Sequence, residues 1–538
     1  MSSLKKMKSK ELSFNEDVEK VSLGNGEVNQ DNLKSVAKNL LTRSSVYAVS
    51  QLVTSSGIAR KFLWLLVLVF GLMGCSYEVY RFLTLYFQYP VVITLEVQNG
   101  WQLDFPAVTV CNLNRIPLNY YMCIKSNLTV TECNEIRCRN GSIERRISTN
   151  LRPILLSERN KFAPCSTNFD GVFSDEHVDQ LYFLNQYLSL SNEDRYEAGY
   201  KADTFIESCS YNSESCSTRN FTNFQSIEFG NCFTFNAKSE SNMKPLKTPY
   251  IGPNSGLVVT LNLGINDYSP LTSSIGARVV VHEPHAKPNP EDYGFNISPG
   301  FETSVSLQQR SIHRLPHPYR DKCKHYDQEF MDSDRNQEDC IRKCMQNENF
   351  QRCGCADPFL PADSSLDLCD LRNQTLMCCL DEVMKSLTRD ATPCPCPLPC
   401  ETTYYEMTTS KAEWPAFPYY KEFIKDPKPT LSPCNNDTEH TVGHEENYPE
   451  MKRTTAKLKV FYKTLENTSY KQEPMFQESE LFSQLGGQLG LWLGVSLVAL
   501  FECIENVSHL LHYCISKSGI RNKQSQSSSL KIKKSMKM

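Results

Sequence analysis

The sequence predicts a membrane protein of the α+β class, in which two transmembrane helices enclose a large, disulfide-rich extracellular domain with a β-sheet core and peripheral helices. Two observations carry this prediction. The 538-residue chain has an apolar segment near each end, and most of its cysteines lie between the two segments. A helix needs about 20 apolar residues to cross a hydrocarbon core, and only these two segments approach that length.

The first apolar segment spans residues 62–87 and contains two charged residues, Glu78 and Arg81. The second has no charge between residues 481 and 501. We therefore expect transmembrane helices at residues 62–87 and 481–511, joined by an extracellular domain at 88–480.

Charge predicts the orientation. Arg60 and Lys61 directly precede the first apolar segment, and the tail after Cys514 is basic with no acidic residue. Basic flanks mark the cytoplasmic side, so residues 1–61 and 512–538 are expected in the cytoplasm of a multi-pass plasma membrane protein. The first sixty residues lack the early apolar stretch of a removable signal peptide, which makes the first helix its own signal anchor.

The cysteines and glycosylation acceptors indicate an oxidising compartment. Of the 23 cysteines, 20 lie between Cys111 and Cys434, an even number that is typical of a disulfide framework. We expect this framework to include Cys111, Cys209, Cys216, Cys232, Cys323, Cys340, Cys344, Cys353, Cys355, Cys369, Cys394, Cys396 and Cys400. Seven N-x-S/T glycosylation acceptors lie in the same region: Asn127, Asn140, Asn220, Asn296, Asn373, Asn436 and Asn467.

A zinc site is the alternative interpretation of the closely spaced cysteines around 340–355 and 394–400. Such a site needs reduced thiols, and histidines are few and scattered here. Cys340 and Cys344 are four residues apart on an expected helix and would present sulfurs from successive turns to one partner segment. Disulfides that clamp helices are therefore favoured over a metal site.

The extracellular domain mixes strand and helix patterns. Strands are expected at residues 107–111, 232–236, 257–263, 277–281, 304–307 and 457–465. Helices are expected at residues 175–190, 337–347, 374–387 and 414–424.

The second apolar segment carries the features that point to function. Ser483, Gly487, Gly490 and Gly494 recur at helical spacing and share one face. That face has two open interpretations, a small-residue stripe for helix packing or the wall of a pore. Glycine weakens a helix, so residues 494–496 (Gly-Val-Ser) are a natural break. Its freed carbonyls and serine hydroxyl are groups that can replace an ion's hydration shell.

Two acidic residues follow, Glu502 and Glu505, three residues apart on one face of the helix. Acidic residues beneath an apolar span usually face a cavity. The plainer alternative is that these carboxylates reach cytosolic water from the helix end, and the two arrangements are compatible.

With these residues in view, the chain is identified as resembling the degenerin/epithelial sodium channel superfamily, which includes acid-sensing and peptide-gated sodium channels. Five blocks in the family's order carry the resemblance: residues 105–114 (FPAVTVCNLN) after the first span, 230–236 (GNCFTFN) and 294–301 (GFNISPGF) of the palm, the cysteine series 323–400 of the thumb, and 486–496 (GGQLGLWLGVS) of the second span.

The resemblance implies roles for particular residues. Those at the family's functional positions are the selectivity filter Gly494, Val495 and Ser496, the outer pore positions Ser483, Gly487 and Gly490, the inner acidic positions Glu502 and Glu505, the gating pair Tyr89 and Tyr319, and the desensitisation switch Leu465 and Glu466. The family usually has tryptophan at the position of Tyr319.

The chain also departs from the family. Tyr47 and Ala48 stand where the family has a cytoplasmic His-Gly pair that affects open probability, so a heteromeric or modulatory subunit becomes plausible. The histidine of proton-gated members is Val91 here, and their lysine ahead of the Gly-x-Gly loop falls near Tyr250. Losing a group that titrates near neutral pH argues against proton gating. Additional cysteines, Cys123, Cys133 and Cys138, indicate a differently built finger region.

The expected function is a subunit of a trimeric, amiloride-sensitive, sodium-selective channel gated by an extracellular ligand. The blocks around 250–256 (YIGPNSG) and 399–405 (PCETTYY) resemble those of invertebrate channels opened by FMRFamide-like neuropeptides, so a peptide agonist is expected. The alternatives are a proton-gated, constitutively open or mechanically gated member, or a modulatory subunit that needs a partner. The expected partners are Na⁺, the lipid bilayer and related subunits in a homo- or heterotrimer, with no cofactor, metal or nucleic acid.

Other classes of protein fit less well. A two-span ATP-gated receptor would need clustered basic residues for the triphosphate, and the loop has no such cluster. An ectoenzyme is disfavoured because the sequence has no Gly-x-Ser-x-Gly, His-Glu-x-x-His or P-loop motif. An adhesion receptor would not need a glycine-rich break in its second span.

Overall fold

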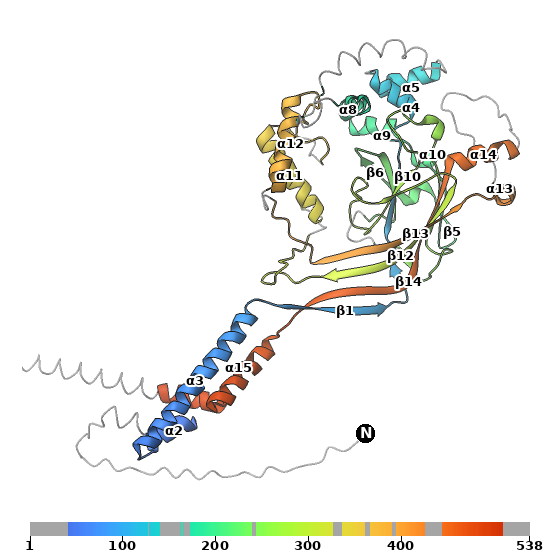
Figure 1. Ribbon diagram of the computed structural model, residues 1–538. Helices are drawn as coiled ribbons and strands as arrows, with labels where there is room; N and C mark the ends of the chain where they lie inside the picture. Colours follow the sequence, from blue (N-terminus) through green and yellow to red (C-terminus); the bar gives the residue numbers. More distant parts are fainter. Residues whose placement is uncertain are drawn as a thin grey trace, which may run out of the picture. The chain divides into compact units, whose positions relative to one another are not determined.

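The computed structural model describes residues 41–508, except for residues 43, 127, 140–161, 163–164, 166–172, 239–243, 327–335, 361–365, 390–393 and 425–443. The chain divides into two compact units, which we describe separately (Figure 1). Residues Tyr89–Met475 form the β-rich unit, and residues Met1–Gln88 together with Phe476–Met538 form the helical unit.

The larger sheet of the β-rich unit is organised around one long strand, β14. Its strand order is β13-β12-β14-β9-β4-β5, and β1 also pairs with β14. The strands are β1 (Val91–Asn99), β4 (Ile206–Tyr211), β5 (Glu214–Ser215), β9 (Leu257–Asn262), β12 (Phe301–His313), β13 (Glu401–Glu413) and β14 (Thr455–Pro474). The first half of β14 lies between β9 and β12, whereas its second half lies between β1 and β12.

A second sheet packs against the first. It has the order β11-β10-β3-β7-β6, and a two-stranded sheet of β2 and β8 stands beside it. The strands are β2 (Leu103–Asp104), β3 (Ala107–Asn112), β6 (Phe221–Ser226), β7 (Gly230–Phe235), β8 (Lys247–Thr248), β10 (Ala277–His282) and β11 (Phe295–Ile297).

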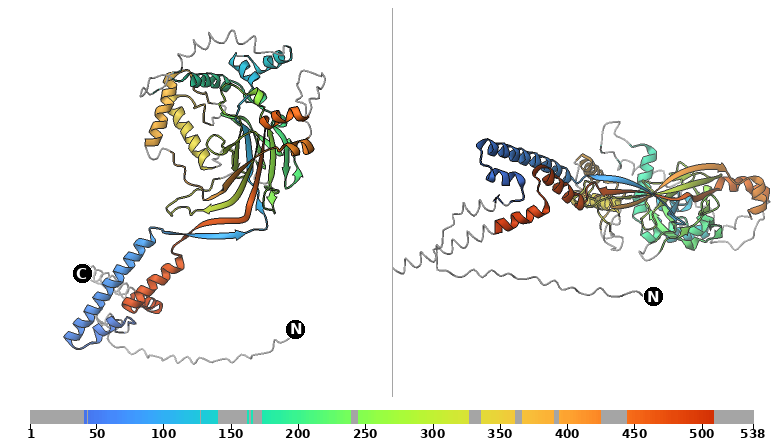
Figure 2. Two further views of the ribbon diagram at one scale, coloured as in Figure 1. Left: turned by 45° about the vertical axis from the view of Figure 1, so that its right-hand side comes forward. Right: turned by 90° about the horizontal axis from the view of Figure 1, so that it is seen from below.

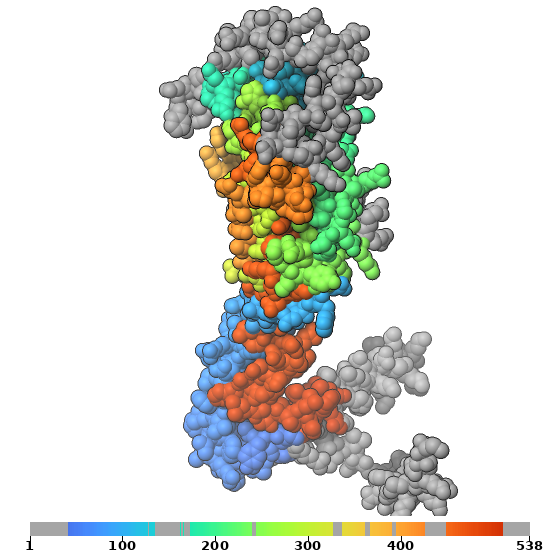
Figure 3. All heavy atoms as spheres, turned by 90° about the vertical axis from the view of Figure 1, so that its right-hand side faces the viewer, coloured from blue at the N-terminus to red at the C-terminus, as the bar shows by residue number. Residues whose placement is uncertain are grey.

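The main hydrophobic core lies between the two sheets. Val108 of β3 and Phe233 of β7 belong to the same buried cluster as Val259 of β9, Val305 of β12 and Leu458 of β14. Burial alternates along β14, as period-2 side-chain geometry requires for a strand with one face on a core. At the edge of the larger sheet, β13 is mostly exposed, and its orange residues reach the surface in Figure 3.

Helices cover the ends and sides of the β-rich unit (Figures 1 and 2). They are α4 (Leu118–Lys125), α5 (Val130–Arg139), α8 (Asp175–Leu188), α9 (Asn192–Ala198), α10 (Ala202–Phe205), α11 (Gln337–Cys353), α12 (Gln374–Arg389), α13 (Phe417–Phe423) and α14 (His444–Thr454), with short 3-10 turns at Thr218–Asn220 and Ile265–Asp267. The α11 helix is capped by the Asn336 side chain, which accepts a hydrogen bond from the N–H of Asp339, and it ends at the left-handed Gly354.

Disulfides hold α11 and α12 in place. Because α11 buries only Gln346 and Asn349, apolar packing alone would anchor it weakly. Nine disulfides connect the described residues: Cys111–Cys232, Cys123–Cys133, Cys165–Cys378, Cys209–Cys216, Cys323–Cys400, Cys340–Cys396, Cys344–Cys394, Cys353–Cys379 and Cys355–Cys369. Every cysteine of the expected framework is paired, and the successive turns at 340 and 344 do reach one segment, 394–396.

The helical unit contains α2 (Tyr47–Thr54), α3 (Ile58–Tyr86) and α15 (Glu478–Leu493). α3 is long and apolar enough to span a membrane. α15 qualifies only together with a second helix, residues 497–508, and the pair bends by 78° at the break between them. α3 and α15 lie side by side, and α2 packs on α3 (Figure 2).

The helices and strands predicted from the sequence are all present, with shifted ends. The strand expected at 457–465 continues to Pro474, and the short candidate at 304–307 is the 13-residue β12. The helix expected at 414–424 begins only at Phe417. The sequence did not predict β1, β2, β4, β5, β6, β8, β11 and β13, nor the helices α2, α4, α5, α9, α10 and α14.

One prediction concerns the stability of the β-rich unit against pH. His282 on β10 lies 2.8 Å from the Thr109 hydroxyl through Nε2 and 2.9 Å from the Glu283 carbonyl oxygen through Nδ1. Burial lowers the pKa of His282 to about 4, whereas an unfolded histidine has a pKa of about 6.5. The unfolded chain therefore binds the proton more tightly between these values, so stability present above about pH 6.5 is lost as the pH falls toward 4.

The expected loss at this site is about 3 kcal/mol in the free energy of unfolding. Urea unfolding of the purified full-length protein at several pH values measures it. His282→Gln should flatten the pH dependence, while the same change at the exposed His177 should not. An unchanged slope in the His282 variant would contradict the assignment.

Candidate functional site

The apolar helix α15 ends in an αL cap at the predicted break. Gly494 is left-handed, with φ of +65°. Its N–H donates to the Gly490 carbonyl at 3.0 Å, and the N–H of Val495 donates to the Leu489 carbonyl at 3.2 Å. Glycine adopts this conformation without the steric cost of a Cβ, which explains why the helix stops here.

The break leaves backbone carbonyls without donors. Among the described residues, no hydrogen bond reaches the carbonyl oxygens of Leu491 and Leu493. The Ser496 hydroxyl accepts a hydrogen bond from the N–H of Ala499 at 3.3 Å and so caps the second helix. Open carbonyls beside a serine hydroxyl are groups that can coordinate a dehydrated cation.

The small-residue face of α15 meets no other segment among the residues that the structure describes. Ser483, Gly487 and Gly490 are exposed. A Cβ added to Gly487 would have no described atom within 4 Å, and one added to Gly490 would meet only the Val495 carbonyl oxygen at 4.0 Å. Packing against the described part of the chain therefore does not explain this stripe, which leaves another subunit's helix or an aqueous path beside it.

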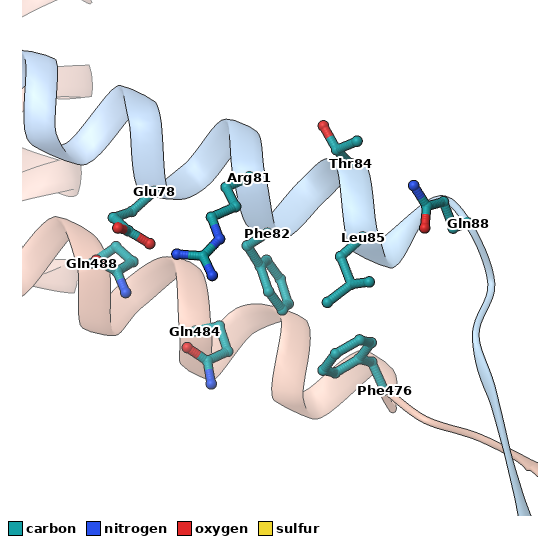
Figure 4. A pocket seen from close by; sticks show the side chains of 9 residues that line it. All are labelled: Glu78, Arg81, Phe82, Thr84, Leu85, Gln88, Phe476, Gln484 and Gln488. Carbon is teal, nitrogen blue, oxygen red and sulfur yellow. The ribbon is translucent and has the colours of Figure 1, made fainter.

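Two charged side chains of α3 line a pocket shared with α15. Figure 4 shows Glu78 and Arg81 directed from α3 toward Gln484 and Gln488 of α15, in a cavity of about 470 Å³. Phe82 and Phe476, whose rings meet edge-on with centroids 5.4 Å apart, contribute to its lining. Charged residues in apolar helices generally face protein or water-filled space, so these two charges are compatible with a membrane-spanning α3.

The two acidic residues after the break are placed differently from each other. Glu502 is partly buried, and its Oε2 accepts hydrogen bonds from the backbone N–H of Ser45, at 3.1 Å, and from the Ser45 hydroxyl. Glu505 is exposed. Sequence reasoning placed both at the inner pore and missed the Ser45 contact, because no local pattern joins residues 457 positions apart.

The segment that carries Ser45 is held on α3 through α2. The rings of Tyr47 and Trp64 meet edge-on with centroids 5.3 Å apart. Tyr47 therefore packs on the first long helix. The N-terminal segment thus connects α3 to the helix after the break.

In the β-rich unit, Tyr89 and Tyr319 are in contact. Their ring centroids lie 5.7 Å apart in an edge-on arrangement. Tyr89 has φ of +49°, a left-handed conformation that is uncommon outside glycine. Such strain is often retained at functional positions, and here it lies at the first residue of the unit.

Gln472 of β14 tethers the loop that carries Tyr319. Its Oε1 accepts a hydrogen bond from the N–H of Leu315 at 3.0 Å, and its Nε2 donates to Asp321 Oδ2 at 2.6 Å. The Pro90 carbonyl accepts a hydrogen bond from the N–H of Met475 at 2.9 Å, next to this tether. Sequence reasoning missed Gln472, since a glutamine in a strand gives no signal of its partners.

Leu465 and Glu466 lie in an irregular stretch of β14. Leu307 of β12 pairs with Tyr462, and Gln309 pairs with Asn467, so four residues of β14 oppose a single residue of β12. A bulge of this kind locally loosens a strand pair and changes its direction.

The remaining predicted positions are scattered over the β-rich unit. Asn220, Asn296 and Asn373 are exposed, whereas Asn467 is partly buried and donates to the Ser311 hydroxyl at 3.4 Å. The other glycosylation acceptors lie outside the described residues: Asn127, Asn140 and Asn436.

Comparison with known proteins places these features in a family context. The sequence profile described as amiloride-sensitive sodium channel matches residues 40–506. The chain is 27% identical over 509 residues to the epithelial sodium channel subunit alpha of Neoceratodus forsteri, covering 83% of this chain and 74% of the relative. It is 28% identical over 485 residues to the human subunit alpha, covering 79% and 70% of the two chains. It is 25% identical over 547 residues to the subunit gamma of Bos taurus, covering 88% and 81%.

The Gln472 tether yields a prediction. Gln472→Leu removes both hydrogen bonds to the 315–321 loop and leaves the N–H of Leu315 without its acceptor. Hydrogen exchange of the loop, measured by mass spectrometry on the purified protein, should accelerate by about fivefold to tenfold, the effect of a lost hydrogen bond worth roughly 1 kcal/mol. Gln98→Leu on β1, where the side chain bonds only the neighbouring Glu96, should leave the loop unchanged. Equal exchange in parent and Gln472→Leu would refute the tether.

Proposed function

Because the chain belongs to the amiloride-sensitive sodium channel family, whose profile it matches over most of its length, we propose that it is a subunit of a trimeric, sodium-selective, amiloride-sensitive channel opened by an extracellular peptide. The observation that carries the pore assignment is the helix break at the left-handed Gly494 inside an apolar segment, next to an open small-residue face. One such helix cannot enclose a path, so several copies of α15 must converge around an axis.

In this proposal α3 crosses the membrane, and α15 crosses it together with the helix after the break. Both termini lie in the cytoplasm, in agreement with the basic flanks. Gly494, Val495 and Ser496 form the filter, with Ser483, Gly487 and Gly490 above it. The carbonyls left open at the break supply oxygen ligands for Na⁺. Glu505, exposed after the break, attracts cations to the inner mouth, whereas Glu502 is engaged by Ser45.

Gating works through the strands that lead into the helices. β1 follows α3 in the chain, β14 precedes α15, and the two strands pair from Val91–Pro474 to Asn99–Glu466. A ligand shifts the closed–open equilibrium only if it binds the open form more tightly. A rearrangement of the β-rich unit reaches both strands through the contact between Tyr89 and Tyr319 and through the Gln472 tether. The bulge at Leu465–Glu466 is where β14 can flex.

A peptide is favoured over protons as the agonist because Val91 stands where proton-gated members of the superfamily have a histidine. His282, which is partly buried on β10, has its pKa lowered to about 4 by burial, too low to respond near neutral pH. The alternatives within the family are proton gating, constitutive opening and mechanical gating. A modulatory subunit that requires a partner is supported by Tyr47 and Ala48 in place of the His-Gly pair.

The filter assignment predicts the effect of Gly494→Ala. The left-handed conformation costs a non-glycine residue about 1–2 kcal/mol, so the break should shift and the Na⁺/K⁺ permeability ratio should fall severalfold. The ratio is measured from reversal potentials in oocytes expressing the chain alone or with related subunits. The Ser483→Trp substitution is added to hold the channel open, because the resemblance places Ser483 at the outer pore position where bulky residues keep such channels open. Gly57→Ala, ahead of α3 and with no described atom within 4 Å, is the matched control. An unaltered ratio in a conducting Gly494→Ala channel would sink the filter assignment.

The agonist assignment makes a separate prediction. A panel of amidated peptides applied to oocytes that express the chain should evoke an amiloride-blocked sodium current, and acidification alone should not. Silence to every peptide combined with a current evoked by acid would replace peptide gating by proton gating. If Ser483→Trp conducts while neither stimulus acts, the chain is instead a subunit whose agonist site needs a partner.

A further inference from the structure

We propose that Gly71 and Gly74 of α3 are positioning residues for the ion filter, because they form the seat of Trp492 in the last turn of α15. The inference rests on the pore role proposed for residues 494–496. It assigns to the first long helix a part in ion selectivity that does not require it to touch the ion.

The contact between the two helices has no room for a side chain on α3. A Cβ at Gly74 would lie 2.5, 2.6 and 2.8 Å from three ring carbons of Trp492. A Cβ at Gly71 would lie 2.8 Å from the backbone carbonyl oxygen of Trp492. Separations this short are well inside van der Waals contact, so glycine is needed at both positions for this approach.

The burial of α3 singles out the same place. In this 29-residue helix, the buried residues are Gly71 and Cys75, which lie four apart on the face that Gly74 also borders. The rest of α3 is partly or largely exposed within the chain. The seat is therefore a point of close contact between α3 and α15.

The Trp492 ring is held from other sides as well. Its indole N–H donates to Gln488 Oε1 at 3.1 Å, one turn earlier on α15. Phe70 meets the ring edge-on, with centroids 5.9 Å apart. A ring fixed in this way cannot easily rotate out of the seat, so pressure on it is transmitted to the helix backbone.

The backbone that receives this pressure leads directly into the proposed filter. Trp492 is two residues before Gly494, and its own carbonyl points at Gly71. The open carbonyls of Leu491 and Leu493 flank it in the chain. Groups that select a ligand must be held within about 0.5 Å of their working positions, and the glycine seat holds this turn.

The two glycines make different predictions, which allows a sharp test. Gly74→Ala collides with a side chain, so shortening that side chain with Trp492→Leu should relieve the collision. Gly71→Ala collides with a backbone carbonyl, which Trp492→Leu cannot move away. In channels held open by Ser483→Trp, both alanine variants should lower the Na⁺/K⁺ permeability ratio severalfold, and Trp492→Leu should restore much of it in the Gly74→Ala background alone.

Gly57→Ala is the matched control, since a Cβ at this position ahead of α3 meets no described atom within 4 Å and should leave the ratio unchanged. A Gly74→Ala channel with the parent ratio, or a double variant no better than Gly74→Ala, overturns the inference. Should Gly74→Ala fail to reach the cell surface, recovery of surface labelling and of the ratio by Trp492→Leu supports the seat, and its absence overturns it. If Gly494→Ala changes the Na⁺/K⁺ permeability ratio while Gly74→Ala does not, the glycine seat is refuted and the filter assignment stands. If Gly494→Ala leaves the ratio unchanged, the filter assignment itself is refuted.

Discussion

The proposed mechanism depends on one constraint: a helix that stops inside an apolar segment leaves backbone carbonyls without donors. In hydrocarbon such groups are tolerated only where they face protein or water. The N–H groups of Gly494 and Val495 satisfy the carbonyls of Gly490 and Leu489, and the carbonyl of Trp492 is directed at Gly71. The carbonyls of Leu491 and Leu493 have no hydrogen-bond donor among the described residues. Packing of α3 against α15 therefore does not account for the break. An aqueous path beside α15 can.

The same constraint gives β14 its importance, because this strand leads the chain into α15. Its first half is fixed in the core, where Ala456, Leu458, Val460 and Tyr462 are fully buried. Its second half does not pack on that core and is held by strand pairing with β1 and β12. The bulge around Leu465 separates the two halves. A rigid half and a compliant half in one strand allow a movement of the core to be passed on without unfolding the sheet.

The sequence predicted what depends on local pattern. The break at residues 494–496 followed from glycine spacing, and the clamp formed by Cys340 and Cys344 followed from helical periodicity. β13 was missed because it is an edge strand with little buried surface, so its residues 401–413 show no apolar alternation. The Ser45–Glu502 contact, the Gln472 tether and the Trp492 seat join segments distant in the chain. Their side chains are ordinary polar or small residues, and only the folded chain brings them together.

The N-terminal segment bears on whether the chain conducts alone. In the proposed channel, the departure at Tyr47 and Ala48 would weaken support for the inner end of the pore. Yet the structure supports the helix after the break by other means, because Ser45 holds Glu502 through its backbone N–H as well as its hydroxyl. A backbone donor does not depend on which side chains follow it, and charge-assisted hydrogen bonds of this kind are among the stronger ones. The missing His-Gly pair therefore argues for altered open probability more than for a chain unable to form a pore. The ring contact between Tyr47 and Trp64 keeps α2 on α3 and so holds Ser45 within reach of Glu502. On this reasoning, the stability of that ring contact distinguishes a homomeric channel from a modulatory subunit.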